Sequence, residues 1–196
     1  DGNSAKPLVK QIIKEVYACG GHPYVEIKDS SVTREILLGC SEEQLGFMNE
    51  YLLYQMKGMH AYIGVRASDN ASEHADVPSS QQSLYGRMLK PTLRQRIDHS
   101  KWVVLRYPNY SMAQLANTSL ENFEDFYFNV CTLDYGKMDK AMDVLKALMD
   151  KTDKVHITGP GTDLTFSIKG IDAVKCSGER NIPDGEIYTA PVKKSM

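Results

Sequence analysis

The sequence has little of what marks a secreted, membrane-bound or nucleic-acid-binding protein. No apolar run approaches the roughly 20 residues that a membrane span requires, and the first residues do not resemble a signal peptide. With 23 Lys and Arg against 25 Asp and Glu, bulk charge gives no attraction to phosphate backbones. We therefore expect a soluble, cytoplasmic protein with no nucleic-acid and no membrane partner.

Cysteine is also scarce, and its spacing excludes two common uses. The four cysteines form neither CxxC pairs nor a dense pattern, which argues against a zinc knuckle and against a disulfide framework. Each is expected to be a small buried residue in a reducing compartment. They are Cys19, Cys40, Cys131 and Cys176.

The signatures of the common catalytic and nucleotide sites are missing as well. The five histidines include no HExxH pair, and no GxSxG elbow, GxxxxGK[ST] loop or GxGxxG motif after a strand occurs. The group of acidic residues and histidine in residues 72–76 is interpreted as a solvated loop, because no rigid element fixes ligand geometry there. A metal site built wholly inside this chain is therefore not expected.

What the sequence does have is the pattern of an α/β protein. Its 196 residues are 42% hydrophobic and 24% charged, which is enough for a substantial core. Helical and strand patterns alternate along the chain. We predict a layered helix/sheet/helix domain with a mostly parallel or mixed sheet, followed by a β-hairpin that leads into a missing carboxy-terminal catalytic domain.

Four segments carry the helical signals. Apolar residues at helical spacing run from Val9 to Val16, and a second, Met-rich row runs from Met138 to Met149 and is expected to pack in the core. Two capping boxes, at residues 41–44 and 118–121, each precede an apolar helix.

Strand signals fall at residues 24–27, 61–65 and 102–105, and a hairpin is predicted from residues 155–157 and 164–168. These patterns divide the chain into an α/β amino-terminal domain, residues 1–153, that lacks its first strand, and a truncated β-rich segment, residues 154–196, that begins a metal-binding domain.

One stretch combines turn chemistry with carboxylates. Pro183, Asp184 and Gly185 favour a turn, and Glu186 follows directly at the start of a β-like segment. A carboxylate in that place would be held at the lip of a strand. The residues alone leave open whether this is a binding site or an ordinary hairpin turn.

Together with residues 107–113, 120–126 and 158–168, the stretch 181–191 resembles the M29 aminopeptidases, the thermophilic metalloprotease family. The resemblance implies a metal-dependent aminopeptidase that removes amino-terminal residues from a peptide substrate, acting as a homodimer. It implies that Glu186 is a ligand of a centre of two divalent metal ions (Zn, Co, Mn or Mg). The other family ligands, another Glu with His and Asp residues, belong to a carboxy-terminal region that this sequence does not contain.

In the intact enzyme the resemblance implies that paired metals activate a bridging water and polarise the scissile carbonyl. Glu179 and Asp184 are interpreted as structural, and no catalytic residue and no organic cofactor site is assigned. The 196-residue chain alone is expected to be inactive, because one carboxylate supplies too few donors. Two alternatives stay open: a non-catalytic α/β packing or dimerisation module, and a small-ligand-binding domain with its site at the carboxyl ends of the strands.

Overall fold

The computed structural model describes residues 3–193 and residue 195, and the chain divides into two compact units, Asp1–Phe128 and Asn129–Met196. Each unit is described by itself. The division of domains at residue 153 that the sequence predicts stays a prediction.

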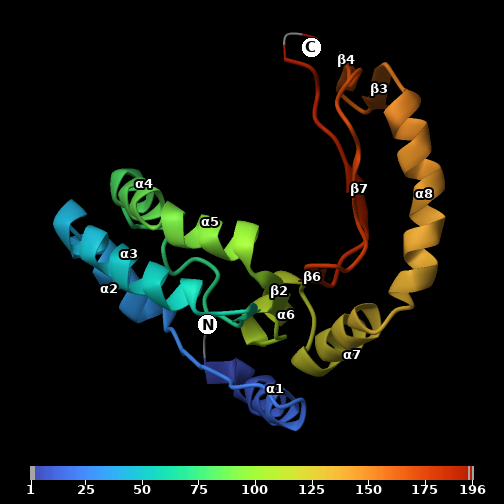
Figure 1. The fold of residues 1–196 in the computed structure, drawn as a ribbon. Helices are drawn as coiled ribbons and strands as arrows, with labels where there is room; N and C mark the ends of the chain where they lie inside the picture. Colours follow the sequence, from blue (N-terminus) through green and yellow to red (C-terminus); the bar gives the residue numbers. More distant parts are fainter. Residues whose placement is uncertain (1–2, 194, 196) are drawn as a thin grey trace. The chain divides into compact units, whose positions relative to one another are not determined.

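The first unit is mainly helical around a parallel strand pair (Figure 1). The strands β1 (Ala61–Arg66) and β2 (Lys101–Arg106) run parallel in a register that pairs Ala61 with Lys101 and Arg66 with Arg106. The predicted α/β class with a parallel pair is confirmed. The helical elements are η1 (Asn3–Ala5), α1 (Lys6–Ala18), α2 (Ser30–Gly39), α3 (Glu42–Lys57), α4 (Ser79–Met88), α5 (Lys90–His99), α6 (Tyr110–Leu115) and α7 (Leu120–Cys131), whose last turn passes Phe128.

Helix packing in this unit follows the apolar positions. Helices α3, α4 and α5 contact one another, and α5 also contacts β2. Leu45 on α3 is completely buried, and its helix begins where Ser41 accepts a hydrogen bond from the amide of Gln44 at 3.2 Å. This confirms the helix start predicted from the first capping box.

Two local predictions need correction, and one helix was not predicted. Residues 24–27 form an irregular segment rather than a strand, because no strand in the described part of the chain pairs with them and Tyr24 is 62% exposed. The helix that starts near Leu120 is capped by Ser119, which accepts from the amide of Asn122 at 3.2 Å, and not by Thr118. Helix α2 was not predicted; its signal is Asp29, whose carboxylate accepts the amides of the first turn.

The second unit consists of a long helix and short strands. These are α8 (Tyr135–Lys151), β3 (Lys154–Gly159), β4 (Thr162–Ser167), β5 (Val174–Cys176), β6 (Asn181–Ile182) and β7 (Glu186–Tyr188). The predicted hairpin is confirmed: β3 and β4 pair antiparallel around a two-residue turn, in which Gly161 adopts φ 74°. Strands β5 and β7 form a second antiparallel pair, and α8 contacts both.

The apolar row of α8 is only partly in a core. Met138, Met142 and Met149 are half-buried, whereas Leu145 is 50% and Leu148 63% exposed within the described structure. The prediction that the whole row packs is therefore wrong for these two leucines and for Ala141, which is also exposed.

The cysteine prediction also holds only in part. Cys40 is buried and Cys131 and Cys176 are half-buried, all as free thiols, but Cys19 is exposed at the end of α1. Its helix terminates there and no element of the described chain covers that end.

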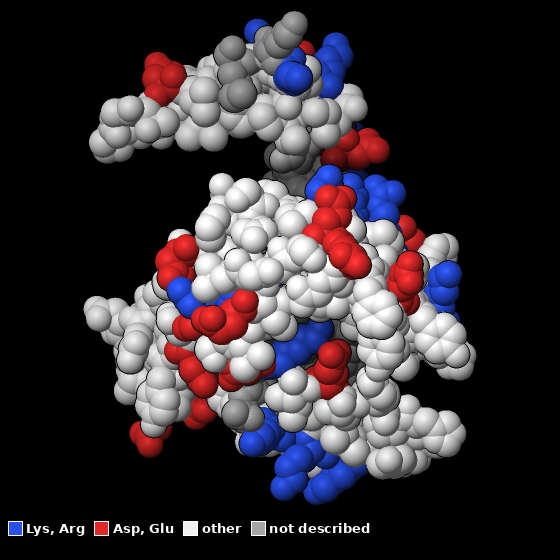
Figure 2. Space-filling model, turned by 90° about the vertical axis from the view of Figure 1, so that its left-hand side faces the viewer, with Lys and Arg blue, Asp and Glu red and all other residues white. Residues whose placement is uncertain are grey.

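Charge on the surface is mixed. Figure 2 shows Lys and Arg beside Asp and Glu at several places on one face, separated by uncharged surface. An ion pair of this kind joins Arg34 to Asp76, with 3.0 Å between the guanidinium Nε and the carboxylate Oδ1. The arginine lowers the pKa of Asp76, chiefly through this hydrogen bonding.

Candidate functional site

The structure places the predicted metal ligand Glu186 at the first position of β7. Its partner in the antiparallel register is Cys176 on β5. The chain reaches Glu186 through Pro183, which follows a cis peptide bond, and through Gly185, whose φ of 134° suits glycine alone. The predicted turn before Glu186 therefore exists.

Hydrogen bonds fix this turn from both sides. The carboxylate of Asp184 accepts the amide of Gly178 at 3.0 Å, and the amide of Asp184 donates to the hydroxyl of Tyr135 at 3.3 Å. Gly178 has φ 98°, and a Cβ there would lie 2.6 Å from Cδ1 of Tyr135. The glycine thus lets the chain pass directly against the aromatic ring.

A polar network continues from the turn to α8. The hydroxyl of Ser177 donates to Asp139 at 2.6 Å and to Glu179 at 3.3 Å, and Nζ of Lys175 lies 2.8 Å from Asp139 and 2.5 Å from Asp143. The hydrogen bond from Lys175 lowers the pKa of Asp139, with a further contribution from Ser177, and Asp139 in turn raises the pKa of Lys175. The network holds the β5 side of the turn on the helix.

Glu186 differs from these neighbours because its carboxylate is exposed and, among the described residues, has no hydrogen bond or ion pair. It lies near Cys176, whose pKa is raised by partial burial and then by the carboxylates of Asp184 and Glu186. The carboxylates of Glu179 and Asp184 instead accept hydrogen bonds from backbone amides. Glu186 is thus the carboxylate of this segment that is free to bind a ligand.

A complete metal site is not found in the described residues. No group of three or more His, Cys, Asp or Glu side chains there could hold a metal ion. The donor set present, one carboxylate, does not by itself fit a divalent ion that needs at least three protein ligands. The segment contributes a single exposed carboxylate at the start of β7.

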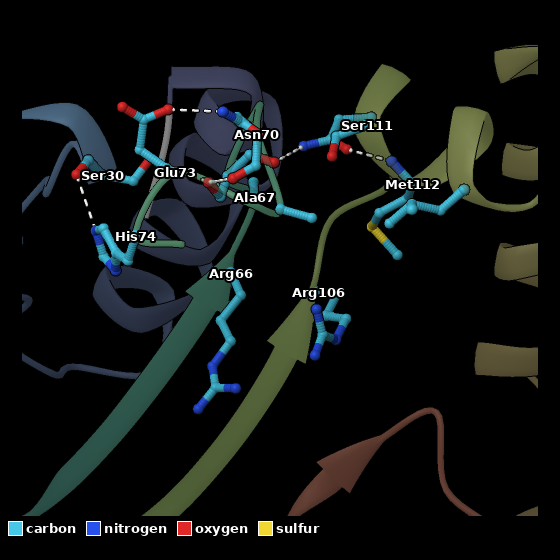
Figure 3. Close-up of a pocket in the computed structure, with 13 residues that line it drawn as sticks. Ser30, Arg66, Ala67, Asn70, Glu73, His74, Arg106, Ser111 and Met112 are labelled. Atoms are coloured by element: carbon cyan, nitrogen blue, oxygen red, sulfur yellow. Dashed lines mark hydrogen bonds between the residues drawn. The ribbon is translucent and has the colours of Figure 1, made fainter. Parts of the chain in front are cut away.

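A second candidate site lies in the first unit at the carboxyl ends of β1 and β2 (Figure 3). This is the place named in the small-ligand-binding alternative, although the sequence assigned no residue to it. It is a cavity of about 290 Å³ with a lining that is polar and apolar in similar parts. Arg66 and Arg106, the last residues of the two strands, both contribute to it. The signal in the sequence is that each apolar strand ends in an arginine, but their proximity depends on the parallel register.

The loop at residues 72–76, interpreted as solvated, forms one wall of this cavity through Glu73 and His74. The ring nitrogen Nε2 of His74 lies 3.0 Å from the carbonyl oxygen of Ser30, and it must be the donor because a carbonyl only accepts. Glu73 accepts a hydrogen bond from the side-chain amide of Asn70 at 2.8 Å. Neither residue forms part of a metal cluster in the described structure.

A larger depression of about 570 Å³ adjoins the cavity and shares Ser30, Arg66 and His74 with it. On its floor the guanidinium of Arg96 lies over the ring of Tyr62, 4.7 Å from the ring centroid. Such a cation–π contact holds the α5 side chain on the strand face.

The fold is that of an α/β protein, and the turn before β7 presents the exposed carboxylate of Glu186. The sequence matches the family model described as thermophilic metalloprotease (M29) over residues 2–196, and the chain belongs to this family.

Wild-type AmpT from Thermus thermophilus is a similar solved structure, with a TM-score of 0.70 and 19% sequence identity. The match covers 96% of this chain and 54% of that chain, so this chain spans about half the length of AmpT. At this identity the likeness concerns the fold. The search of curated proteins finds no match. None of the described helices is both long and apolar enough to cross a membrane.

Proposed function

We propose that this chain is the amino-terminal part of a metal-dependent aminopeptidase, and that Glu186 supplies one ligand to its metal centre. The observation that carries the proposal is the match to the metalloprotease family along the whole chain, including the turn that precedes Glu186. AmpT, the similar structure, is about twice as long, which leaves room for further ligands in the rest of the protein.

The geometry around Glu186 supports the ligand role. The turn is fixed by the hydrogen bonds of Asp184, and the exposed carboxylate has no partner in the described chain that would compete with a metal. Because the backbone of the turn is already fixed, binding an ion would require ordering of the Glu186 side chain alone. Ser177 and Glu179 hydrogen-bond to each other in the same segment, and they would affect only the position of Glu186.

When bound, a pair of divalent ions such as zinc, cobalt, manganese or magnesium would supply Lewis acidity and an activated water for hydrolysis of the first peptide bond. The role of this chain would be to bind one of the ions through Glu186 and to hold the backbone of that residue in place. The 196-residue chain by itself is proposed to be inactive, because a single carboxylate does not retain a catalytic ion.

The test compares the whole protein with its Glu186→Gln variant, using a leucine chromogenic amide in the presence of each of the four metals. We expect kcat/KM to fall about 100-fold or more and the bound metal, measured by plasma mass spectrometry, to decrease. The matched control is Glu43→Gln, an exposed carboxylate in the first turn of α3, which should behave like the wild type.

Two results would count against parts of the proposal separately. If Glu186→Gln retains full activity and metal content, the ligand role is wrong. If the folded wild-type protein hydrolyses no aminoacyl amide with any of the four metals, the aminopeptidase assignment is wrong.

The homodimer and the cytoplasmic location that the family resemblance implies belong to the same proposal. Sedimentation equilibrium of the whole protein at several concentrations checks the first, with a monomer mass as the contrary result. Cell fractionation with an antibody to the protein checks the second.

A further inference from the structure

The cavity at the carboxyl ends of β1 and β2 has features of a binding site that the proposed peptidase chemistry does not use. Its position follows from the fold: two parallel strands end side by side, and the loops after them line the cavity. The lining comes entirely from the first unit, and Glu186 is not part of it.

Two cations lie together in this cavity. Arg66 and Arg106 are direct partners in the parallel register, so their side chains leave the sheet on the same side (Figure 3). Within the described structure neither guanidinium forms an ion pair or a hydrogen bond. Like charges placed opposite each other on neighbouring strands destabilise a sheet, and a shared anion would remove that cost.

The strand ends that carry the two arginines, and the loops that follow them, are held by hydrogen bonds within the protein. The carbonyl of Arg66 accepts the amide of Tyr107 at 2.9 Å, and the carbonyl of Arg106 accepts the hydroxyl of Tyr127 at 3.1 Å. Asn109 is 4% exposed and donates to the carbonyl of Ser68 at 2.9 Å, which ties the loop after β2 to the loop after β1. The strand ends therefore keep their spacing.

The rest of the lining sets the chemical class of the ligand. Glu73 is the one carboxylate in the lining, and it is held by Asn70 rather than by an arginine, so two cations face one anion. The hydroxyl of Ser111, which also lines the cavity, has no hydrogen-bond partner among the described residues and can donate. At about 290 Å³ the cavity is of a size that suits a small molecule.

We propose that this cavity binds a small oxyanion, a phosphate or a carboxylate group, between the guanidinium groups of Arg66 and Arg106. The planar fork of arginine can donate two parallel hydrogen bonds to either oxyanion. This site goes beyond the proposed peptidase function and does not depend on it.

The test is titration calorimetry of the whole protein with inorganic phosphate and, separately, with succinate. We expect one of the two to bind with a dissociation constant below ~10 mM. Tighter binding of phosphate would assign a phosphate ligand, and tighter binding of succinate a carboxylate. Absence of heat with both would overturn the proposal.

Variants locate the binding. Arg66→Gln and Arg106→Gln should each weaken it about tenfold or more, and Arg66→Lys, which keeps the charge but loses the fork, should also weaken it. The control is Arg94→Gln on α5, an exposed arginine outside the cavity that removes the same charge. Circular dichroism confirms that each variant is folded.

The proposal is overturned if Arg94→Gln weakens binding as much as the cavity variants do, because that result indicates general charge attraction. It is also overturned if both folded cavity variants bind like the wild type. An unchanged affinity of Arg94→Gln beside weakened cavity variants supports it.

Discussion

The two candidate sites are held in place by different means. The turn before Glu186 depends on backbone conformations that glycine permits, at Gly178 and Gly185, and on a chain passing against an aromatic ring. The strand-end cavity depends on side chains that bond to backbone, chiefly Asn109 and Tyr127. A site of the first kind tolerates almost no side chain at its key positions, whereas a site of the second kind loses one hydrogen bond at a time.

The largest effect is expected at Gly178. In the Gly178→Ala variant the new Cβ would lie 2.6 Å from Tyr135 in a backbone with φ 98°, so we expect a loss of about 3 kcal/mol in the free energy of unfolding. Urea denaturation measures it. The control is Gly170→Ala, with φ 75° but nothing within 4 Å, which should cost only about 1 kcal/mol. Equal losses in both variants would show that the contact with Tyr135 adds no cost at Gly178.

Asn109 is expected to give the next largest effect. Its side chain accepts the amide of Met112 at 3.1 Å and donates to Ser68, and both partners lose a bond in the Asn109→Ala variant. We expect a loss of about 2 kcal/mol by urea denaturation, because the residue is buried. In the exposed Asn122→Ala variant the loss should stay below about 0.5 kcal/mol.

The Tyr127→Phe variant sharpens the comparison further. It removes only the hydroxyl that donates to the carbonyl of Arg106, and it keeps the buried ring. The expected cost is about 1 kcal/mol, measured by thermal unfolding. Tyr110→Phe, at a residue that is 72% exposed, is the matched control and should be neutral. A larger loss than in Asn109→Ala would mean that the hydroxyl bond of Tyr127 to Arg106 does more to fix this strand end than the bond of Asn109 to Ser68.

The smallest effect is expected in the dependence of stability on pH. The pKa of Asp139 is lowered in the folded protein, first by the hydrogen bond from Lys175 and then by that from Ser177. Its contribution to stability is therefore complete above its ordinary pKa of 3.8 and is lost as pH falls through the lower folded value. Comparing urea curves of the wild type and Asp139→Asn, we expect their difference to shrink below about pH 4. A difference that is constant with pH would exclude this carboxylate as the cause.

The sequence predicted what is local in the chain. The helix of residues 6–18, the hairpin and the turn at residues 183–185 each depend on neighbouring residues, and all three are present. The choice of Glu186 as a metal ligand came from the family resemblance instead, because the turn formers that precede it fit an ordinary hairpin turn as well.

What the sequence could not predict depends on partners far along the chain. Residues 24–27 have strand-like composition, but no described strand lies beside them to pair. The residues of the cavity could not be assigned, because Arg66 and Arg106 lie side by side only through the register of β1 and β2, and because the wall formed by His74 needs the carbonyl of Ser30. Periodicity within one segment gives no information about which distant residues pair with it.

The register of the parallel pair also bears on the order in which the chain folds. The β3–β4 hairpin closes through a two-residue turn, whereas β1 and β2 are joined through two helices. Closing a longer loop costs more chain entropy, and non-local strand pairs form slowly. We therefore expect the hairpin to be among the first structures protected from hydrogen exchange during refolding, and the pairing that brings Arg66 to Arg106 to be among the last.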